Sequence, residues 1–203
     1  MKMFLLLAAL LATPTGLVDG LSPTPRNPTV DISAIRYLDC GTWVGSGFII
    51  ADGVLVTAMH VAAGTQCTDT ETGGKLMVYK TDLKHDLALL TGPSLPTDIP
   101  YIKVSCQRFV TGQPYLSYGT TFYDQPRPIS RMNVIMAKGY YSTNADTIDG
   151  VPSPGLRVFD NAIAPGMSGG PVIDLEGRAH GLNNAGSNDT TMIYEFADGI
   201  LCN

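Results

Sequence analysis

Short apolar runs broken by turn residues are the feature of this sequence that most restricts its fold. The runs are rich in Val, Ile, Leu, Tyr and Phe, and Gly, Pro, Asn or Asp separates each run from the next. No long amphipathic helix pattern interrupts them. Many short strands with frequent turn signals are typical of all-β barrels and sandwiches. The expected strands are 43–50, 54–57, 75–79, 87–90, 101–104, 115–118, 132–137, 156–159, 171–174, 179–182 and 191–196.

A loop is expected near the middle of the chain. The stretch 91–100 holds three prolines, which interrupt any strand or helix that includes them. We therefore expect this stretch to lead to the crossing between two halves of the fold.

The N-terminus has the layout of a secretory signal peptide. A lysine at position 2 is followed by an uninterrupted apolar run at 4–12, and then by small residues and proline. The run is shorter than the ~20 residues that span a bilayer. We expect a signal peptide at 1–20 and an extended, proline-rich connector at 21–28, and the alternative is an uncleaved interfacial anchor.

Composition narrows the classes of partner. The formal net charge is −5, which disfavours nucleic acid because phosphate binding needs clustered Lys and Arg. Hydrophobic residues make up 44% of the chain and charged residues 15%, which is enough apolar material for a core. No second long apolar segment follows the N-terminal run. We therefore expect no stable membrane insertion after signal removal, and a secreted or periplasmic location.

The cysteines fit an exported protein. There are four, and an even number in an exported chain indicates disulfides, although four cysteines allow three pairings. The alternative is four buried free thiols.

The segment 166–171 reads Gly-Met-Ser-Gly-Gly-Pro and places Ser168 in a glycine-rich turn. Glycines allow unusual backbone angles and let a substrate carbonyl approach the chain closely. In such a turn the backbone N–H groups of Gly166 and Ser168 can point to one place, which is the geometry that stabilises an oxyanion. The alternative is a glycine-rich β-turn in which the serine is incidental.

His60 and Asp86 are the residues that can activate such a serine. His60 follows a strand-like run and a short turn, which places a base suited to neutral pH at a strand end. Asp86 precedes an apolar run directly, where a carboxylate can accept the imidazole N–H and fix its tautomer. Asp82 is a competitor that lacks this following strand. Taken singly, His60 would be structural and Asp86 a turn residue.

Together, these residues carry a family resemblance. Their chain order is His, Asp, Ser, as in the chymotrypsin arrangement, whereas the subtilisin and α/β-hydrolase orders differ. With Thr-Ala-Met-His at 57–60, Asp-Leu-Ala-Leu at 86–89 and the glycine turn, the chain resembles trypsin-like serine peptidases of the chymotrypsin fold. The stretches 160–170 and 181–185 resemble more specifically the bacterial high-temperature-requirement (HtrA/DegP-like) branch.

The resemblance implies a fold and a domain layout. It extends over about 41–197 and implies two perpendicular six-stranded β-barrels with the catalytic residues in the cleft between them. The serine peptidase domain is then 29–203, with barrels at about 29–98 and 99–203. It also implies a disulfide between Cys40 and Cys67, which bracket His60. Cys106 and Cys202 are left as the second pair.

The resemblance further implies where a substrate side chain binds. The floor of the specificity pocket lies six residues before the nucleophile, at Ala162, beside Ile163. Because this position has no carboxylate, we expect cleavage after small or medium apolar residues, not after Lys or Arg. The residues expected to wall the pocket and to pair with the substrate backbone as a strand are Leu182, Asn183, Asn184 and Ala185.

Two features depart from the resembling proteins. The bacterial branch usually carries a C-terminal PDZ domain, whereas this sequence reaches only Asn203, so we expect no PDZ-dependent regulation. Animal digestive members pair a new N-terminus with an Asp just before the nucleophile, and Met167 occupies that position here. We therefore expect no activation by that route.

The sequence thus predicts a secreted serine endopeptidase that acts on protein or peptide substrates through an acyl-enzyme. No cofactor is expected, and no metal site, because the three histidines lack the spacing of zinc ligands. His85 is expected to be a solvated neighbour of Asp86, and His180 a strand residue that faces solvent or core. The alternatives are a non-catalytic binding module on the same scaffold, or an esterase with the same triad.

Overall fold

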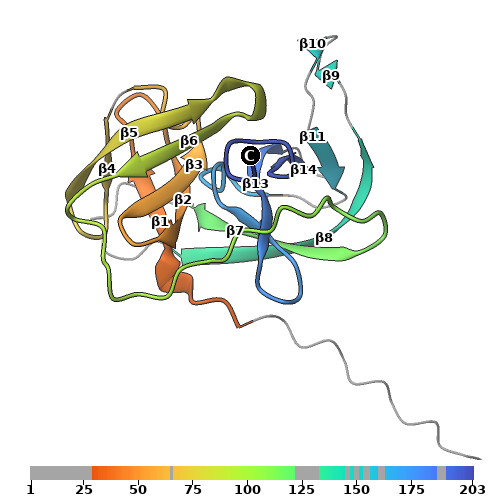
Figure 1. The fold of residues 1–203 in the computed structure, drawn as a ribbon, viewed down its shortest axis with the longest axis horizontal. Coiled ribbons are helices and arrows are strands. Elements are labelled where there is room, and N and C mark those ends of the chain that lie inside the picture. The colour runs from red at the N-terminus through yellow and green to blue at the C-terminus, as the bar shows by residue number, and fades with distance from the viewer. Residues whose placement is uncertain are drawn as a thin grey trace, which may run out of the picture.

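The fold is all-β, as predicted. The computed structural model describes residues 29–64, 66–121, 133–144, 147–148, 151–152, 156–159, 163–186 and 191–203. Within these residues there are two closed six-stranded barrels, two 3-10 turns and no α-helix. In Figure 1 the two barrels lie side by side, the first in orange to olive and the second in green to blue. The signal peptide and connector expected at 1–20 and 21–28 lie outside the described residues.

No helix in the described part of the chain has the length and apolar character needed to cross a membrane.

The first barrel has the strand order β1-β2-β3-β6-β5-β4, and every neighbouring pair is antiparallel. Its strands are β1 (Ile35–Asp39), β2 (Val44–Ala51), β3 (Val54–Ala58), β4 (Gln66–Asp69), β5 (Gly74–Asp82) and β6 (Leu87–Thr91). The 3-10 turn η1 (Ile32–Ala34) precedes β1, and η2 (Leu83–His85) joins β5 to β6.

The second barrel has the strand order β11-β14-β13-β12-β7-β8. Its strands are β7 (Pro114–Thr121), β8 (Asn133–Asn144), β11 (Leu156–Phe159), β12 (Pro171–Ile173), β13 (Ala179–Gly186) and β14 (Thr191–Glu195). The short strands β9 (Thr147–Ile148) and β10 (Val151–Pro152) pair with each other and extend away from the barrel in Figure 1.

Strand β6 shows why strands at the junction of the barrels are apolar on both faces. Side chains alternate along a strand. Leu87 and Leu89 pack into a core shared by the two barrels, whereas Ala88 and Leu90 pack into the interior of the first barrel. A run without polar alternation therefore indicates a strand that is buried on both sides.

The shared core holds the two barrels together. Phe48 of β2 and Phe196, which follows β14, are both almost fully buried, and their ring centroids are 6.3 Å apart. Val56 of the first barrel and Leu116 of the second belong to the same cluster. Burying each such side chain contributes ~1.5–3 kcal/mol, so this cluster is a large part of the docking free energy.

The strand expected at 101–104 is not formed, which corrects the prediction. This segment crosses between the barrels and makes single hydrogen bonds to each. Ile102 N donates to Ile49 O of the first barrel at 2.9 Å, and Ala179 N of the second barrel donates to Lys103 O at 2.8 Å. Because its partners lie on two different barrels, it makes only an isolated bridge, from Val104 to Ala179. The proline-rich stretch before it is a loop, as predicted.

Strands β1 and β4 were not predicted because charged residues interrupt them. Arg36 of β1 and Asp69 of β4 are buried as an ion pair, with 2.7 Å between Arg36 Nη2 and Asp69 Oδ2. Pairing satisfies both charges in the interior. From the sequence alone, each of these residues indicates a turn or a surface position.

Two disulfides are present, Cys40–Cys67 and Cys106–Cys202, which is the pairing that the resemblance implies. The first joins the segment before β2 to β4. The second joins the segment between the barrels to the residues that follow β14.

Removing the two disulfides separately should affect stability unequally. They close loops of 27 and 96 residues, and the chain-entropy argument gives the longer loop about 1 kcal/mol more stabilisation. We expect the variant Cys106→Ala/Cys202→Ala to lose more free energy of unfolding than Cys40→Ala/Cys67→Ala. Denaturant titration of the two variants beside the unmodified protein measures both losses, and a larger loss for the shorter loop would contradict this expectation.

Candidate active site

His60 and Asp86 meet because β3 and β6 are paired strands. Ala58 lies opposite Leu87 at the end of the ladder. The pairing continues one step further, since Met59 N donates to Asp86 O at 2.8 Å. The residues just beyond the ladder on the two strands are therefore held side by side.

Asp86 holds His60 through both carboxylate oxygens, one on the imidazole and one on the backbone. His60 Nδ1 lies 2.6 Å from Asp86 Oδ2, and the backbone N of His60 donates to Oδ1 at 2.9 Å. A carboxylate only accepts, so Nδ1 carries the proton and Nε2 of the neutral ring is left as a base. The His60 side chain is 41% exposed and that of Asp86 only 12%. The base thus reaches solvent while the acid behind it is buried.

Asp86 adopts an unusual backbone conformation. Its φ of 47° is in the left-handed region, which costs free energy in a residue other than glycine. The hydrogen bonds to His60 and to Met59 N stabilise this conformation. Strain of this kind is concentrated at functional sites.

Asn184 connects the two barrels at the site. Its side-chain amide donates to Asp86 Oδ2 at 2.5 Å, and its backbone carbonyl accepts from Ser168 Oγ at 2.9 Å. Asn184 lies at an irregularity of β13, where the register with β14 shifts between Asn183 and Ala185. The residue is displaced from the regular ladder and contacts both the acid and the serine.

Ser168 lies in a turn between β11 and β12 and is half-buried. Its hydroxyl donates a hydrogen bond to Asn184 O. Among the described residues, no hydrogen bond joins Ser168 to His60. Catalytic hydrogen bonds are often unmade in the absence of substrate. The structure thus brings His60, Asp86 and Ser168 into one site, linked through Asn184.

Two backbone N–H groups in this turn are left without an acceptor. The neighbouring amides are all used: Met167 N donates to Ala164 O, Gly169 N to Asn183 O and Gly170 N to Met167 O. Within the described residues, neither Gly166 N nor Ser168 N has a hydrogen-bond acceptor. Gly166 has a φ of 96° in a turn closed by the first of these bonds, which is the type II geometry that requires glycine.

The buried side chain of Met167 restrains this turn. Its side chain is fully buried, and its sulfur accepts from Ala164 N at 3.3 Å. Gly119 of β7 provides the space, because a Cβ at that position would lie 2.7 Å from Met167 Cα. An apolar side chain therefore occupies the place where the resembling animal enzymes have an ion-paired carboxylate.

A hollow of about 410 Å³ opens beside the imidazole. Its lining residues are His60, Leu83, Asp86, Asn184, Ala185 and Tyr194. Asn184 and Ala185 were expected to wall the substrate pocket and lie at this hollow.

Leu182 and Asn183, expected in the same wall, are fully buried. Leu182 packs into the shared core, and the Asn183 amide donates to Tyr118 O at 2.9 Å and Met167 O at 3.3 Å. Their side chains therefore lie in the interior and do not line the hollow. Ile163 is half-buried, and Ala162 lies outside the described residues.

His85 is buried, which corrects the prediction that it is solvated. Its residue exposure is 3%, and its Nδ1 lies 2.8 Å from Asp82 Oδ2. The cause is the turn η2, in which Asp82 caps the backbone N–H groups of Lys84 and His85. Ile200 N also donates to Asp82 Oδ2, at 3.2 Å. Asp82, the other candidate for the catalytic acid, is thus hydrogen-bonded to His85.

His180 is an interior residue, one of the two positions expected for it. Its Nε2 lies 2.8 Å from Asp174 Oδ2, and its Nδ1 lies 2.9 Å from Gln107 O. Both ring nitrogens have partners outside the site. The described residues include no group of three His, Cys, Asp or Glu side chains placed to hold a metal ion.

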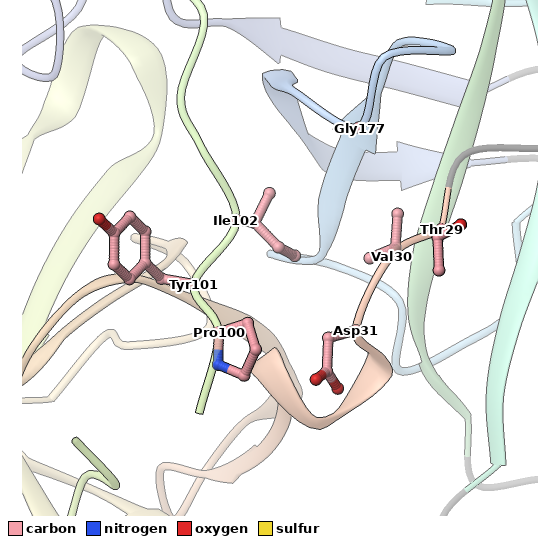
Figure 2. Close-up of a pocket in the computed structure, with 7 residues that line it drawn as sticks. All are labelled: Thr29, Val30, Asp31, Pro100, Tyr101, Ile102 and Gly177. Carbon is pink, nitrogen blue, oxygen red and sulfur yellow. The ribbon is translucent and has the colours of Figure 1, made fainter. Parts of the chain in front are cut away.

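A second hollow lies away from these residues. Figure 2 shows it between the segment that leads into the first barrel, the segment between the barrels and the turn before β13. It encloses about 420 Å³ and is lined by Thr29, Val30, Asp31, Pro100, Tyr101, Ile102 and Gly177. The carboxylate of Asp31 is already bonded to Ser33 N and Oγ, at 2.9 and 2.6 Å. No predicted catalytic residue reaches it, so the candidate active site is the hollow beside His60.

Sequence reasoning did not predict the contact of Asn184 with Asp86, or any role for Ser46. Ser46 N donates to Ser168 O at 2.7 Å. The available signal was Gly-Ser-Gly at 45–47, a run of small residues inside an apolar strand. Such a run marks a close approach of another chain segment.

Comparisons with known proteins agree with this geometry. Residues 45–182 match the family described as the trypsin-like peptidase domain. A probable periplasmic serine endoprotease, DegP-like, of Chlamydia pneumoniae is 31% identical over 156 residues, which are 70% of this chain and 28% of that protein. The chain spans about three tenths of the length of such relatives.

Solved structures show the same fold. The inactive form of the Rv3671c protease of M. tuberculosis H37Rv superposes with a TM-score of 0.62 at 20% identity, over 80% of this chain and 83% of that one. The HtrA-type protease AlgW, solved with a decapeptide, gives a TM-score of 0.57 at 26% identity, over 74% and 47% of the two chains.

Acid should weaken the structure beside Asp86 through Asp82. Burial alone would raise the pKa of Asp82, but the hydrogen bond and charge of His85 and the N–H of Ile200 outweigh it and lower the pKa. A carboxyl with a lowered folded-state pKa contributes stability above its unfolded pKa of ~3.9, and this is lost as pH falls through the folded value. We therefore expect the melting temperature of Asp82→Asn to fall less than that of the unmodified protein between pH 6 and about pH 3. Parallel melting curves at several pH values test this, and equal losses in both proteins would contradict it.

Proposed function

We propose that this chain, which belongs to the trypsin-like peptidase family, is an exported serine endopeptidase with His60, Asp86 and Ser168 as its catalytic residues. One observation carries the proposal. The imidazole held by Asp86 and the hydroxyl of Ser168 share one site with two backbone N–H groups that have no acceptor within the described residues. These are the parts that acyl transfer to serine requires.

In the first half of the reaction Ser168 Oγ attacks the scissile carbonyl carbon. His60 Nε2 takes the hydroxyl proton and then gives it to the leaving amine, and an ester to Ser168 remains. The amides of Gly166 and Ser168 hold the oxygen on which negative charge develops. In the second half a water molecule gives a proton to Nε2 and attacks the ester carbonyl carbon. The bond to Ser168 Oγ then breaks, the acid product leaves, and Nε2 returns the proton to Oγ.

Asp86 and Asn184 support the imidazole. Asp86 fixes the tautomer in which Nε2 is free, and it stabilises the imidazolium that forms. Asn184 donates a further hydrogen bond to the same carboxylate oxygen, which keeps that carboxylate in place. Ser168 must exchange its bond to Asn184 O for one to His60 as the substrate binds.

The hollow beside His60 suits an apolar substrate side chain. Leu83, Ala185 and Tyr194 line it, and Leu83 is 77% exposed. A peptide that lies along the end of β13 would place one side chain there and its scissile bond at Ser168. These three side chains, which share the lining with His60, Asp86 and Asn184, support a preference for small or medium apolar residues, as does the lack of a carboxylate at Ala162. An exported location agrees with the periplasmic naming of the relatives.

Replacing Ser168 by Ala should abolish turnover. The loss expected for removing the nucleophile of a serine peptidase is on the order of 10⁶-fold in kcat. Hydrolysis of casein or of a peptide library by the purified protein, with and without the substitution, measures it. A fluorophosphonate probe should label the unmodified protein at Ser168 and leave Ser168→Ala unlabelled. An unmodified protein that neither labels nor cleaves would instead be a binding module, and one that cleaves only esters would be an esterase.

The cleavage profile should be apolar. Sequencing the products of a peptide library should place Ala, Val or similar residues before most cleaved bonds, because Ala162 has no carboxylate to bind Lys or Arg and the carboxylate at the hollow, Asp86, is already bonded to His60 and Asn184. Ser168→Ala is the control for contaminating peptidases. A profile dominated by Lys or Arg would refute the assignment of the pocket.

A further inference from the structure

Ser46 is a fully buried polar residue of β2 that the proposed chemistry does not use. Its hydroxyl makes three contacts, all to the second barrel. Oγ lies 2.6 Å from Gly166 O, 2.7 Å from Thr120 N and 3.0 Å from Thr120 Oγ1. The hydroxyl of a serine on the first barrel is thus bonded entirely to the second barrel.

The direction of these hydrogen bonds is determined by the atoms involved. A carbonyl oxygen only accepts, so Ser46 must donate its single hydroxyl proton to Gly166 O. Thr120 N only donates, and Thr120 Oγ1 must then donate as well, because the Ser46 proton is already used. The Ser46 hydroxyl therefore donates one hydrogen bond and accepts two. Because both accepted bonds come from Thr120, the hydroxyl proton can point only toward Gly166 O.

The backbone of Ser46 contacts the same turn. Ser46 N donates to Ser168 O at 2.7 Å, and Ser46 O accepts from Thr57 Oγ1 at 2.6 Å. Ser46 thus holds the carbonyl groups of Gly166 and of Ser168, the two residues whose N–H groups lack an acceptor within the described chain. No other residue of the described chain is hydrogen-bonded to both carbonyls.

We infer that Ser46 is a positioning residue for the oxyanion-binding turn. The N–H of Gly166 and of Ser168 each belongs to the peptide just before the carbonyl that Ser46 holds, so holding the two carbonyls restrains the backbone of the residues that carry the two donors. The hydroxyl of Ser46 holds the peptide that follows Gly166, and its N–H holds the peptide that follows Ser168. Correct docking of the two barrels then orients both oxyanion donors. The inference rests on the proposed function, because it assigns a purpose to the same two amides.

The variant Ser46→Ala tests this inference. It removes the bond to Gly166 O and leaves the backbone bond to Ser168 O in place. We expect kcat for a peptide amide substrate to fall by about 10- to 100-fold with KM unchanged, as when an oxyanion donor is misaligned. A peptide aldehyde, whose adduct needs the oxyanion donors, should bind more weakly by a similar factor.

Ser105→Ala is the matched control. Ser105 is also a buried serine whose hydroxyl accepts a backbone N–H, from Gln107 at 3.3 Å, but it lies in the segment between the barrels. Both variants lose one buried hydroxyl, so only an effect on the oxyanion-binding turn should separate them. The final extent of fluorophosphonate labelling measures the fraction of each protein that is folded and reactive. Dividing kcat by this fraction corrects for misfolded protein.

Two results would overturn the inference. The first is an unchanged kcat per labelled site in Ser46→Ala, so that any loss of activity is confined to the labelled fraction, and the second is an equal fall of kcat in Ser105→Ala. If Ser46→Ala does not fold, Ser46→Cys decides, because it keeps the volume but has a weaker donor, and the same readouts apply. An unmodified protein that neither labels nor turns over would refute the proposed function itself, and the inference with it. Normal turnover of the unmodified protein and of Ser46→Ala would refute the inference alone.

Discussion

The packing of one barrel against the other is the interaction on which every part of the site depends. Each barrel closes its own sheet, but neither contains all the groups of the candidate active site. The first provides His60 and Asp86, and the second provides Ser168 and the amides of its turn. The shared core around Phe48 and Phe196 provides the binding free energy between them. Apolar burial has little directional preference, so the buried hydrogen bonds across the same boundary must set the register at which the barrels meet.

Asn184 shows how such a boundary can carry chemistry. Its amide belongs to the second barrel and bonds the acid of the first, while its carbonyl holds the serine hydroxyl until substrate arrives. A bulge in β13 makes both contacts possible, because it turns one residue out of the regular ladder. The same strand buries Leu182 and Asn183 behind the turn and leaves Ala185 at the hollow. One irregular strand thus supports the nucleophile and borders the space for substrate.

The sequence predicted the all-β fold and named the residues of the candidate site because both have strong local signals. Glycines flank Ser168, an apolar strand follows Asp86, and a strand precedes His60. It failed where burial depends on a distant partner. Strands β1 and β4 were missed because Arg36 and Asp69 can each be buried only when paired with the other. His85 is buried because η2 places its ring against Asp82. The segment 101–104 has the composition of a strand, yet its partners lie on two barrels, which local pattern cannot reveal.

The hydrogen bond from Ile200 to Asp82 has a consequence for the order of events during synthesis. These residues are 118 positions apart, and the contact braces the turn that ends at Asp86. The first barrel can close as soon as β6 has emerged, but the acid then lacks both this brace and the amide of Asn184. Under the proposed function, hydrolytic competence would arise only when the last strands have docked. A nascent chain that has not yet reached Ile200 would then lack this activity, without any need for a separate inhibitor.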